Sequence, residues 1–422
     1  MTLLNDAPLS PEDVKAVGWG DFQTLAQNVA RSLPNLPPTS PMLLTGDWGA
    51  GKTTMLKFVA AELAPTSTSV AGLLGHPPIF FDAWLGEHRG GILPAFYEAL
   101  VEAAGVLGTL RASSTDLARQ TTLVRKAGLL LRRALEATAT LDPRTILQAI
   151  SKEALSVNAQ GNLLQAANDF VRTAWPERQP IILIDDLDRC SPETVVTLVE
   201  QIRHLVYRAS DSGLRFILAV DRDIVTRAVA QKYEGIDDFD ANRYLEKIFP
   251  LSVRVPSPGA AMPHVVDYFV DSIREADGRQ NFTPEIREHL RRVFADELFA
   301  NPRLLKRCLN RYLLYREWGG ARLAEDDALL AIKWLAATDR WPDLRRVFRR
   351  FKRDYWERIA RATLLDRTDM PGPEAEKLRK STGLLTWLQN ERIIESQTDG
   401  PRLGSAYERL KGIDTAFMER GQ

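Results

Sequence analysis

The chain is poor in cysteine, has no excess of either charge sign and lacks long hydrophobic runs. Cys190 and Cys308 are its only cysteines, so neither a disulfide framework nor a cysteine zinc cluster can form, and a reducing cytoplasm is favoured. Lys and Arg number 55, as do Asp and Glu, which argues against nucleic-acid binding over the whole surface. A local basic patch is still compatible with this balance.

Membrane and secretion signals are missing as well. No stretch reaches about 18 uninterrupted apolar residues, and the nearest candidate, Ala127–Leu131, runs directly into Arg132 and Arg133. The first fifteen residues show no basic stretch followed by an apolar core, so we expect neither a membrane insertion nor a signal peptide. Hydrophobic residues make up 45% of the chain, which excludes global disorder. At roughly 100–200 residues per domain, the length predicts two or three domains.

Short apolar runs alternate with helical patterns over residues 41–256 and predict an α/β fold with a parallel sheet. Strands are expected at 41–45, 79–84, 181–184, 216–220 and 251–255. Residues 1–40 and everything after 260 show helical periodicity. The segment at about 93–175 is also helical in pattern, and we interpret it as an insertion.

A glycine-rich loop follows the first predicted strand. Residues 46–53, with the sequence GDWGAGKT, match the phosphate-binding pattern GxxxxGK[ST]. In this pattern backbone N–H groups converge on phosphate oxygens, Lys52 reaches the β- and γ-phosphates, and Thr53 can bind Mg²⁺. A chance match is the alternative, but the position between a buried strand and a helix favours the functional interpretation. The predicted nucleotide-binding residues are Gly46, Asp47, Trp48, Gly49, Ala50, Gly51, Lys52, Thr53 and Thr54.

Carboxylates follow the third predicted strand. Asp185, Asp186 and Asp188 come directly after the apolar run that begins at Ile181. We assign Asp185 to Mg²⁺ and Asp186 to the general base that activates water, with Asp188 as a substitute base. Capping of the next helix is the alternative; it explains Ser191 but not three crowded carboxylates. The sequence therefore predicts Mg²⁺-dependent hydrolysis of a nucleoside triphosphate, and a small-molecule kinase is less favoured because the acids suit water activation.

Together these motifs resemble the KAP family of P-loop NTPases, in the additional-strand branch related to AAA+ and STAND ATPases. The resemblance covers residues 20–315 and includes Phe81-Asp82-Ala83-Trp84, Ala219-Val220-Asp221-Arg222, Tyr244-Leu245-Glu246-Lys247-Ile248 and Asn301-Pro302-Arg303. It implies an NTPase domain over 1–260 whose acid strand lies beside the phosphate-loop strand. A helical lid over 261–340 and a C-terminal helical region over 341–422 complete the expected organisation.

The resemblance also implies charged residues that act on the phosphates from a distance. Arg243 lies where oligomeric relatives present an arginine finger to a neighbour; a surface pair with Glu246 is the alternative. Arg303 or Arg307 lies where the helical lid of relatives contributes a phosphate sensor, and Arg303 is chosen here. Asp221 is either a sensor of the γ-phosphate or a turn residue. The expected partners are ATP and a protein partner or a second copy of the chain.

One further segment, residues 341–360, combines arginines with aromatic residues. It is a candidate nucleic-acid or partner-binding helix, although an amphipathic helix with buried aromatics is favoured. The resemblance suggests an ATP-driven switch in bacterial defence against phage or mobile elements. A nucleotide-dependent scaffold or nucleic-acid-associated protein with little hydrolysis is the alternative.

Overall fold

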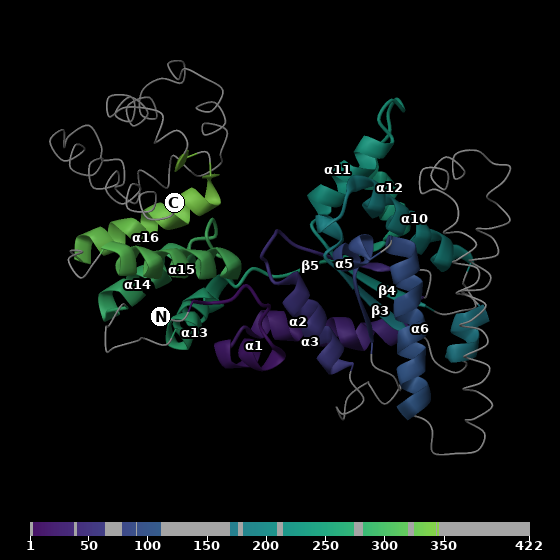
Figure 1. The fold of residues 1–422 in the computed structure, drawn as a ribbon, viewed down its shortest axis with the longest axis horizontal. Helices are drawn as coiled ribbons and strands as arrows, with labels where there is room; N and C mark the ends of the chain where they lie inside the picture. Colours follow the sequence, from purple (N-terminus) through teal and green to yellow (C-terminus); the bar gives the residue numbers. More distant parts are fainter. Residues whose placement is uncertain are drawn as a thin grey trace. The chain divides into compact units, whose positions relative to one another are not determined.

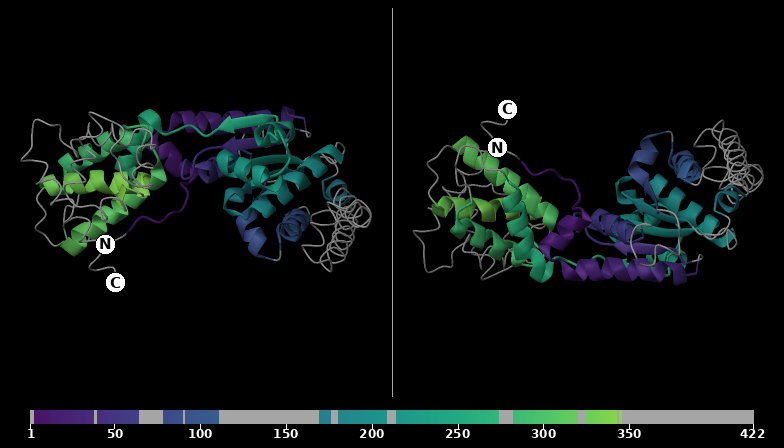
Figure 2. Two further views of the ribbon diagram at one scale, coloured as in Figure 1. Left: turned by 90° about the horizontal axis from the view of Figure 1, so that it is seen from above. Right: turned by 90° about the horizontal axis from the view of Figure 1, so that it is seen from below.

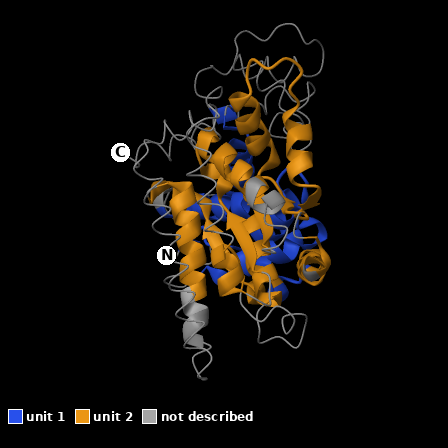
Figure 3. Ribbon diagram, turned by 90° about the vertical axis from the view of Figure 1, so that its right-hand side faces the viewer, with its two compact units in different colours: residues 1–7, 15–19, 257–422 blue, residues 8–14, 20–256 orange. Residues whose placement is uncertain are grey.

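The computed structural model describes residues 3–37, 40–63, 78–89, 91–110, 169–175, 180–208, 214–273, 282–319, 325–342 and 344–345. The chain divides into two compact units (Figure 3). The unit drawn in orange, called the first unit below, comprises residues 8–14 and 20–256, and the unit drawn in blue, called the second unit, comprises residues 1–7, 15–19 and 257–422. The domain limits at 260 and 340 stay predictions. Most of the predicted insertion, of the segment 341–360 and of the region 341–422 lies outside the described residues.

The first unit contains a five-stranded sheet whose neighbouring strands are all parallel (Figure 1). Its strands are β1 (Met42–Thr45), β2 (Ile79–Asp82), β3 (Ile181–Asp185), β4 (Arg215–Val220) and β5 (Leu251–Arg254), in the order β2-β3-β4-β1-β5. This confirms the predicted parallel sheet. The expectation that the acid strand lies beside the phosphate-loop strand is wrong, because β4 lies between β1 and β3. β4 is apolar from Phe216 onward and buried there, which is the pattern of a central strand.

Helices cover both faces of this sheet, as the burial of side chains on both sides of its inner strands indicates. Every residue of β1 and β3 is buried, whereas the edge strands β2 and β5 alternate between more and less buried positions. Alternate strand residues, such as Leu43, Ile182 and Leu218, share one core with α6 (Ile92–Leu110), α10 (Pro192–Arg208), α11 (Arg222–Lys232) and α12 (Ala241–Ile248). Outside that core, α3 (Lys52–Glu62) contacts β3 and β4 and packs against α2 (Gly20–Ser32) (Figure 2).

The second strand ends earlier than predicted. Residues 79–84 were expected as a strand, but β2 ends at Asp82, and the short helix α5 (Ala83–His88) begins at the next residue. The Asp82 carboxylate accepts a hydrogen bond from the backbone N–H of Leu85 at 2.8 Å. This capping bond satisfies a helix N-terminus and explains the early end of the strand.

The second unit is helical in its described part. After the short turn η3 (Gly259–Ala261) it contains α13 (Met262–Ser272), α14 (Pro284–Ala295), α15 (Pro302–Gly319) and α16 (Glu325–Arg340). α13 packs on α14 and α15, and α16 packs on the same two helices. Phe269, Phe294, Tyr312 and Trp334 are buried in this unit. The helical pattern predicted after residue 260 is therefore present as far as the structure describes it.

The remaining N-terminal elements are α1 (Pro11–Val17) and the turn η1 (Leu33–Asn35). The Arg215 guanidinium donates to the carbonyl oxygens of Leu33 and Leu36, and so joins the start of β4 to the segment that leads into β1. Among the described helices, none combines the length and the apolar character needed to cross a membrane.

Candidate functional site

The loop between β1 and α3 has a backbone that requires glycine. Gly49 and Gly51 have φ values of 83° and 94°, in the left-handed region that side chains disfavour. At Gly46 an added Cβ would lie 3.3 Å from the Cβ of Ala50 and 3.5 Å from that of Val255, so the loop packs tightly there. The Ala50 N–H donates to the Asp47 carbonyl at 3.0 Å and closes the turn. The predicted glycine pattern thus corresponds to a tight loop at the N-terminus of α3.

Lys52, the first residue of α3, carries a buried positive charge. Its Nζ donates to the carbonyl oxygens of Gly46 at 2.8 Å and of Asp47 at 3.3 Å. Nζ also lies 3.3 Å from Oδ2 of Asp188, and the two side chains are only 8% and 4% exposed. A buried ammonium is costly unless it is paired and hydrogen-bonded, and these three acceptors meet that need.

Asp185 is the last residue of β3 and is buried beside the start of α3. Its carboxylate accepts hydrogen bonds from the Thr53 side chain and from the backbone N–H of Asp186, the latter at 2.9 Å. Burial, helped by the charge of Asp188, raises the pKa of Asp185, while the hydrogen bonds and Lys52 oppose that shift. The structure therefore brings together Thr53 and Asp185, the two residues predicted to bind Mg²⁺.

Asp186 adopts a backbone conformation that is uncommon outside glycine. Its φ is 56°, in the left-handed region, where it begins the turn η2 (Leu187–Arg189). Oδ1 of Asp186 lies 2.9 Å from Nε of Arg189. Burial and then the charge of Asp185 raise the pKa of Asp186 to about 6, although Arg189 opposes the rise. Strained backbone of this kind clusters at functional sites, so we treat the conformation as support for a functional role.

Two further acids lie in this region and were not predicted as site residues. Asp82 is aligned with Asp185 across β2 and β3, and its charge contributes to the raised pKa of Asp186. Glu87 on α5 accepts hydrogen bonds from the backbone N–H and the hydroxyl of Ser191 at 3.1 and 2.6 Å. Asp82 could have been found by the pattern that identified Asp185, an acid at the end of an apolar strand. No sequence pattern points to Glu87.

Asp221 and Arg243 have defined local partners. Asp221 caps α11 by accepting from the Asp223 N–H at 3.1 Å, which corresponds to the predicted turn. Arg243 on α12 is 83% exposed and lies 4.0 Å from Asp240, whose carboxylate caps the same helix. The alternative interpretation of Arg243, a surface pair with Glu246, is wrong in its partner, because Glu246 pairs with Arg222 at 3.0 Å. The capping carboxylate is already placed beside Arg243, which explains the exchange of partners.

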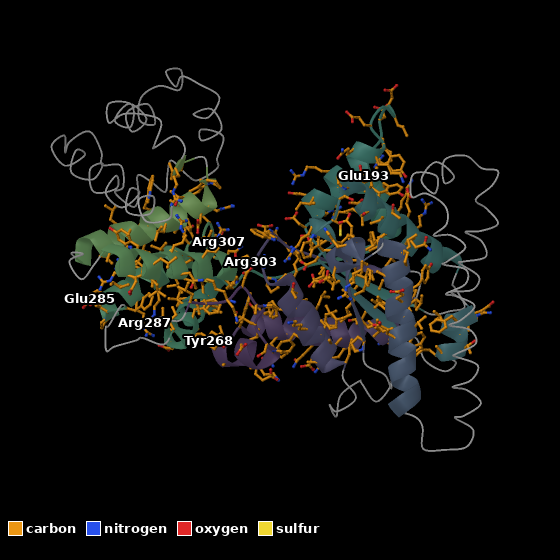
Figure 4. All side chains as sticks on the ribbon, in the orientation of Figure 1. Glu193, Tyr268, Glu285, Arg287, Arg303 and Arg307 are labelled. Carbon is orange, nitrogen blue, oxygen red and sulfur yellow. The ribbon has the colours of Figure 1, made fainter. Side chains whose placement is uncertain are left out.

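The predicted lid arginines lie on α15 in the second unit (Figure 4). Nε of Arg303 is 2.9 Å from Oδ1 of Asp6, and Arg307 lies 3.3 Å from Oδ1 of Asp339. On the phosphate-binding loop itself, Trp48 is exposed, Thr54 is buried, and Asp47 lies 3.7 Å from Arg254 at the end of β5.

Known proteins resemble this chain in sequence and in structure. A model of the KAP family P-loop domain matches residues 22–317. The chain is 24% identical over 269 residues to the Phage T7 exclusion protein of Escherichia coli strain K12; the alignment covers 59% of this chain and 34% of that protein. The chain thus spans about a third of that relative.

Among solved structures, the ORC2 protein of Aeropyrum pernix in its ADP form is similar at 13% identity and a TM-score of 0.41, covering 95% of this chain and 94% of that one. Cdc6p of Pyrobaculum aerophilum is similar at 11% identity and a TM-score of 0.43, covering 95% and 96%.

Proposed function

The chain belongs to the KAP family of P-loop domains, as its motifs predicted, and we propose that it binds ATP with Mg²⁺ and hydrolyses it as a molecular switch. The observation that supports this best is the meeting of Lys52, Thr53 and Asp185 at the carboxyl end of the parallel sheet. Ligands of open α/β sheets bind at that end of the strands. In this proposal, the tight loop presents its backbone N–H groups to the phosphates, and the N-terminus of α3 favours their negative charge.

The residues present fit a magnesium ion. Among the described residues, no group of three or more His, Cys, Asp or Glu side chains could hold a metal by itself. Mg²⁺ in nucleotide sites is commonly held by one or two protein oxygens together with phosphate oxygens and water, and the hydrogen-bonded Thr53 and Asp185 provide such a pair. When bound, the ion would supply positive charge that neutralises the phosphates. An ion would also favour the ionised form of the buried Asp185.

Asp186 is our proposed general base. A carboxyl with a pKa near 6 is ionised at neutral pH, yet it accepts a proton more readily than an ordinary aspartate. The ion pair with Arg189 and the left-handed backbone hold its carboxylate in place. Asp186 would orient the attacking water through an oxygen of its carboxylate and take up the water proton there.

Two arginines complete the proposal. Arg243 is strongly exposed and is proposed to reach the site of a neighbouring copy as an arginine finger. Arg303 is proposed to sense the phosphates from the helical lid, which requires that it exchange its ion pair with Asp6 for a phosphate contact. Both roles make the switch dependent on assembly or on the state of the second unit.

The likeness to the Phage T7 exclusion protein supports a proposal about biology. We propose that the switch acts in the bacterial cytoplasm and excludes phage. A host that carries the gene should show a lower efficiency of plating than a host with the Lys52→Ala variant. Equal plating across a broad phage panel would contradict this part of the proposal.

The test of the biochemical proposal is equilibrium binding of ATP to the full chain with and without Mg²⁺. Lys52→Ala should weaken binding at least about a hundredfold, since it removes a charge that contacts two phosphates. Lys57→Ala, an exposed lysine on the same helix, is the matched control and should bind like the wild type. Circular dichroism must show both variants folded. Binding without hydrolysis would favour the nucleotide-dependent scaffold instead.

A further inference from the structure

Asp188 is a buried acid that the proposed reaction does not yet use. A single oxygen of its carboxylate, Oδ2, lies 3.3 Å from Nζ of Lys52 and accepts a hydrogen bond from the backbone N–H of Asp221 at 3.1 Å. The side chain is almost fully buried. It therefore joins three segments: the turn after β3, the start of α3 and the end of β4.

The sheet order explains why Asp188 makes this connection. β4 lies between β3 and β1, and the Asp188 carboxylate lies at the carboxyl end of β4, where it contacts both the backbone of Asp221 and Lys52 at the start of the helix that follows β1. Asp185 ends β3 itself, whereas the turn η2 carries Asp188 further along the chain to the backbone of Asp221, the residue that follows β4. From that point its carboxylate reaches Lys52.

Lys52 needs such a partner if its charge is to be held in one place. A lysine side chain has a flexible four-carbon stem and three donors. The contacts with Gly46, Asp47 and Asp188 account for three acceptors from two different segments. The two loop carbonyls belong to the same turn, whereas Asp188 is the carboxylate in direct contact with the ammonium from the β3–β4 side of the site.

We propose that Asp188 is a positioning residue for Lys52, which it holds in register with Asp185 and Asp186 through the end of β4. This inference rests on the proposed ATPase function. A phosphate could replace the 3.3 Å contact with the Asp47 carbonyl while the contact with Asp188 persists. A misplacement of about 1 Å at a reacting centre can cost about a hundredfold in rate, so the anchor matters for turnover more than for affinity.

The test compares Asp188→Asn and Asp188→Ala with the wild-type full chain. The Asn variant keeps an acceptor oxygen for Lys52 and the Asp221 N–H, whereas the Ala variant removes it. We expect Asp188→Ala to lower kcat for ATP at least about tenfold with less than about a threefold change in affinity, and Asp188→Asn to restore most of the loss. Glu246→Gln, which breaks the exposed pair with Arg222, is the matched control and should leave kcat unchanged.

A second measurement does not require nucleotide. Acylation of Lys52 by an amine-reactive reagent, followed by mass spectrometry, should be at least about fivefold faster in Asp188→Ala than in the wild type, because the substitution removes one of the three acceptors that hold and cover Nζ, and with it the carboxylate that favours the unreactive charged form. Unchanged labelling would overturn the inference. Faster labelling with an unchanged kcat would also overturn it, since the pair would then be structural only. If the wild type binds no ATP, the proposed function fails, and labelling alone decides whether Asp188 holds Lys52.

Discussion

The carboxyl end of the sheet and the α13–α14 face of the helical unit both combine acids with basic residues, but they differ in burial. Lys52 and Asp188 are almost fully buried. On the helical unit, Arg287 and Arg291 pair with Asp267, and these side chains are between 27% and 35% exposed. Burying charge is costly, and even a good ion pair often fails to repay that cost. The buried charges at the sheet therefore suggest a functional constraint, whereas the partly exposed pairs of the helical unit are explained by the packing of α13 and α14 alone.

The Arg243→Ala variant tests this comparison most severely, because the largest loss of turnover is expected from an exposed charge and not from a buried one. If Arg243 acts in a neighbouring copy, its loss should lower turnover by about 10³–10⁵-fold while ATP affinity is retained. Turnover of the wild type should also rise with protein concentration. Arg227→Ala, an exposed arginine on α11, is the control. A constant specific activity in a monomeric sample that Arg243→Ala leaves unaltered would remove the trans finger.

Asp186→Asn should sharpen the comparison, because it changes one charge inside the acid cluster. Loss of a general base typically costs about 10²–10⁴-fold in rate, so hydrolysis should fall by that factor while ATP stays bound. Asp185→Asn should instead weaken the Mg²⁺-dependent part of binding. Single-turnover kinetics and Mg²⁺ titrations measure the two effects. Exchanged behaviour would show that the two roles are reversed, and full activity in both variants would rule out the hydrolase.

Stability offers the most direct contrast between the two regions. Removing one partner of a buried ion pair costs about 3–5 kcal/mol, so Lys52→Ala should lower the free energy of unfolding by that amount. Arg291→Ala on the helical unit should cost less than about 1 kcal/mol, since its pair with Asp267 is partly solvated. Urea unfolding measures both. Equal losses would mean that burial does not separate the regions.

A further expected effect is a pH dependence that originates in Asp186. Its pKa is raised to about 6 in the folded protein, above the ordinary value of about 3.9, so the native state binds the proton more tightly. Its stabilising contribution is therefore complete below about pH 4 and is lost as the pH rises through about 6. Turnover should rise over the same window, because the base must be ionised. Asp186→Asn should remove the contribution of Asp186 to the pH dependence of both stability and turnover. If the wild type and Asp186→Asn showed the same pH dependence of stability, the raised pKa would not belong to Asp186.

The predicted strands agree closely with the structure because most are short apolar runs and the last, LSVR at 251–254, alternates apolar and polar residues; both patterns depend on neighbouring residues alone. The glycine loop was recognisable for a related reason: its positive φ values and close packing require residue types that the sequence displays directly. The end of β2 was misjudged, because the capping bond of Asp82 competes with an apolar pattern that continues through Trp84.

The sequence by itself determined the family, the parallel α/β class, the phosphate-binding loop and the strand that ends in acids, because all of these depend on residue type at fixed spacing. Tertiary structure alone decided that β4 lies between β1 and β3, that Asp188 reaches Lys52 and that Arg243 lies beside Asp240. These outcomes depend on which strands pair and on which carboxylate a buried or exposed cation meets. Some of these contacts join residues that are distant in the chain. In others, two nearby carboxylates are alternative partners for the same arginine. The periodicity of the sequence carries no information about either.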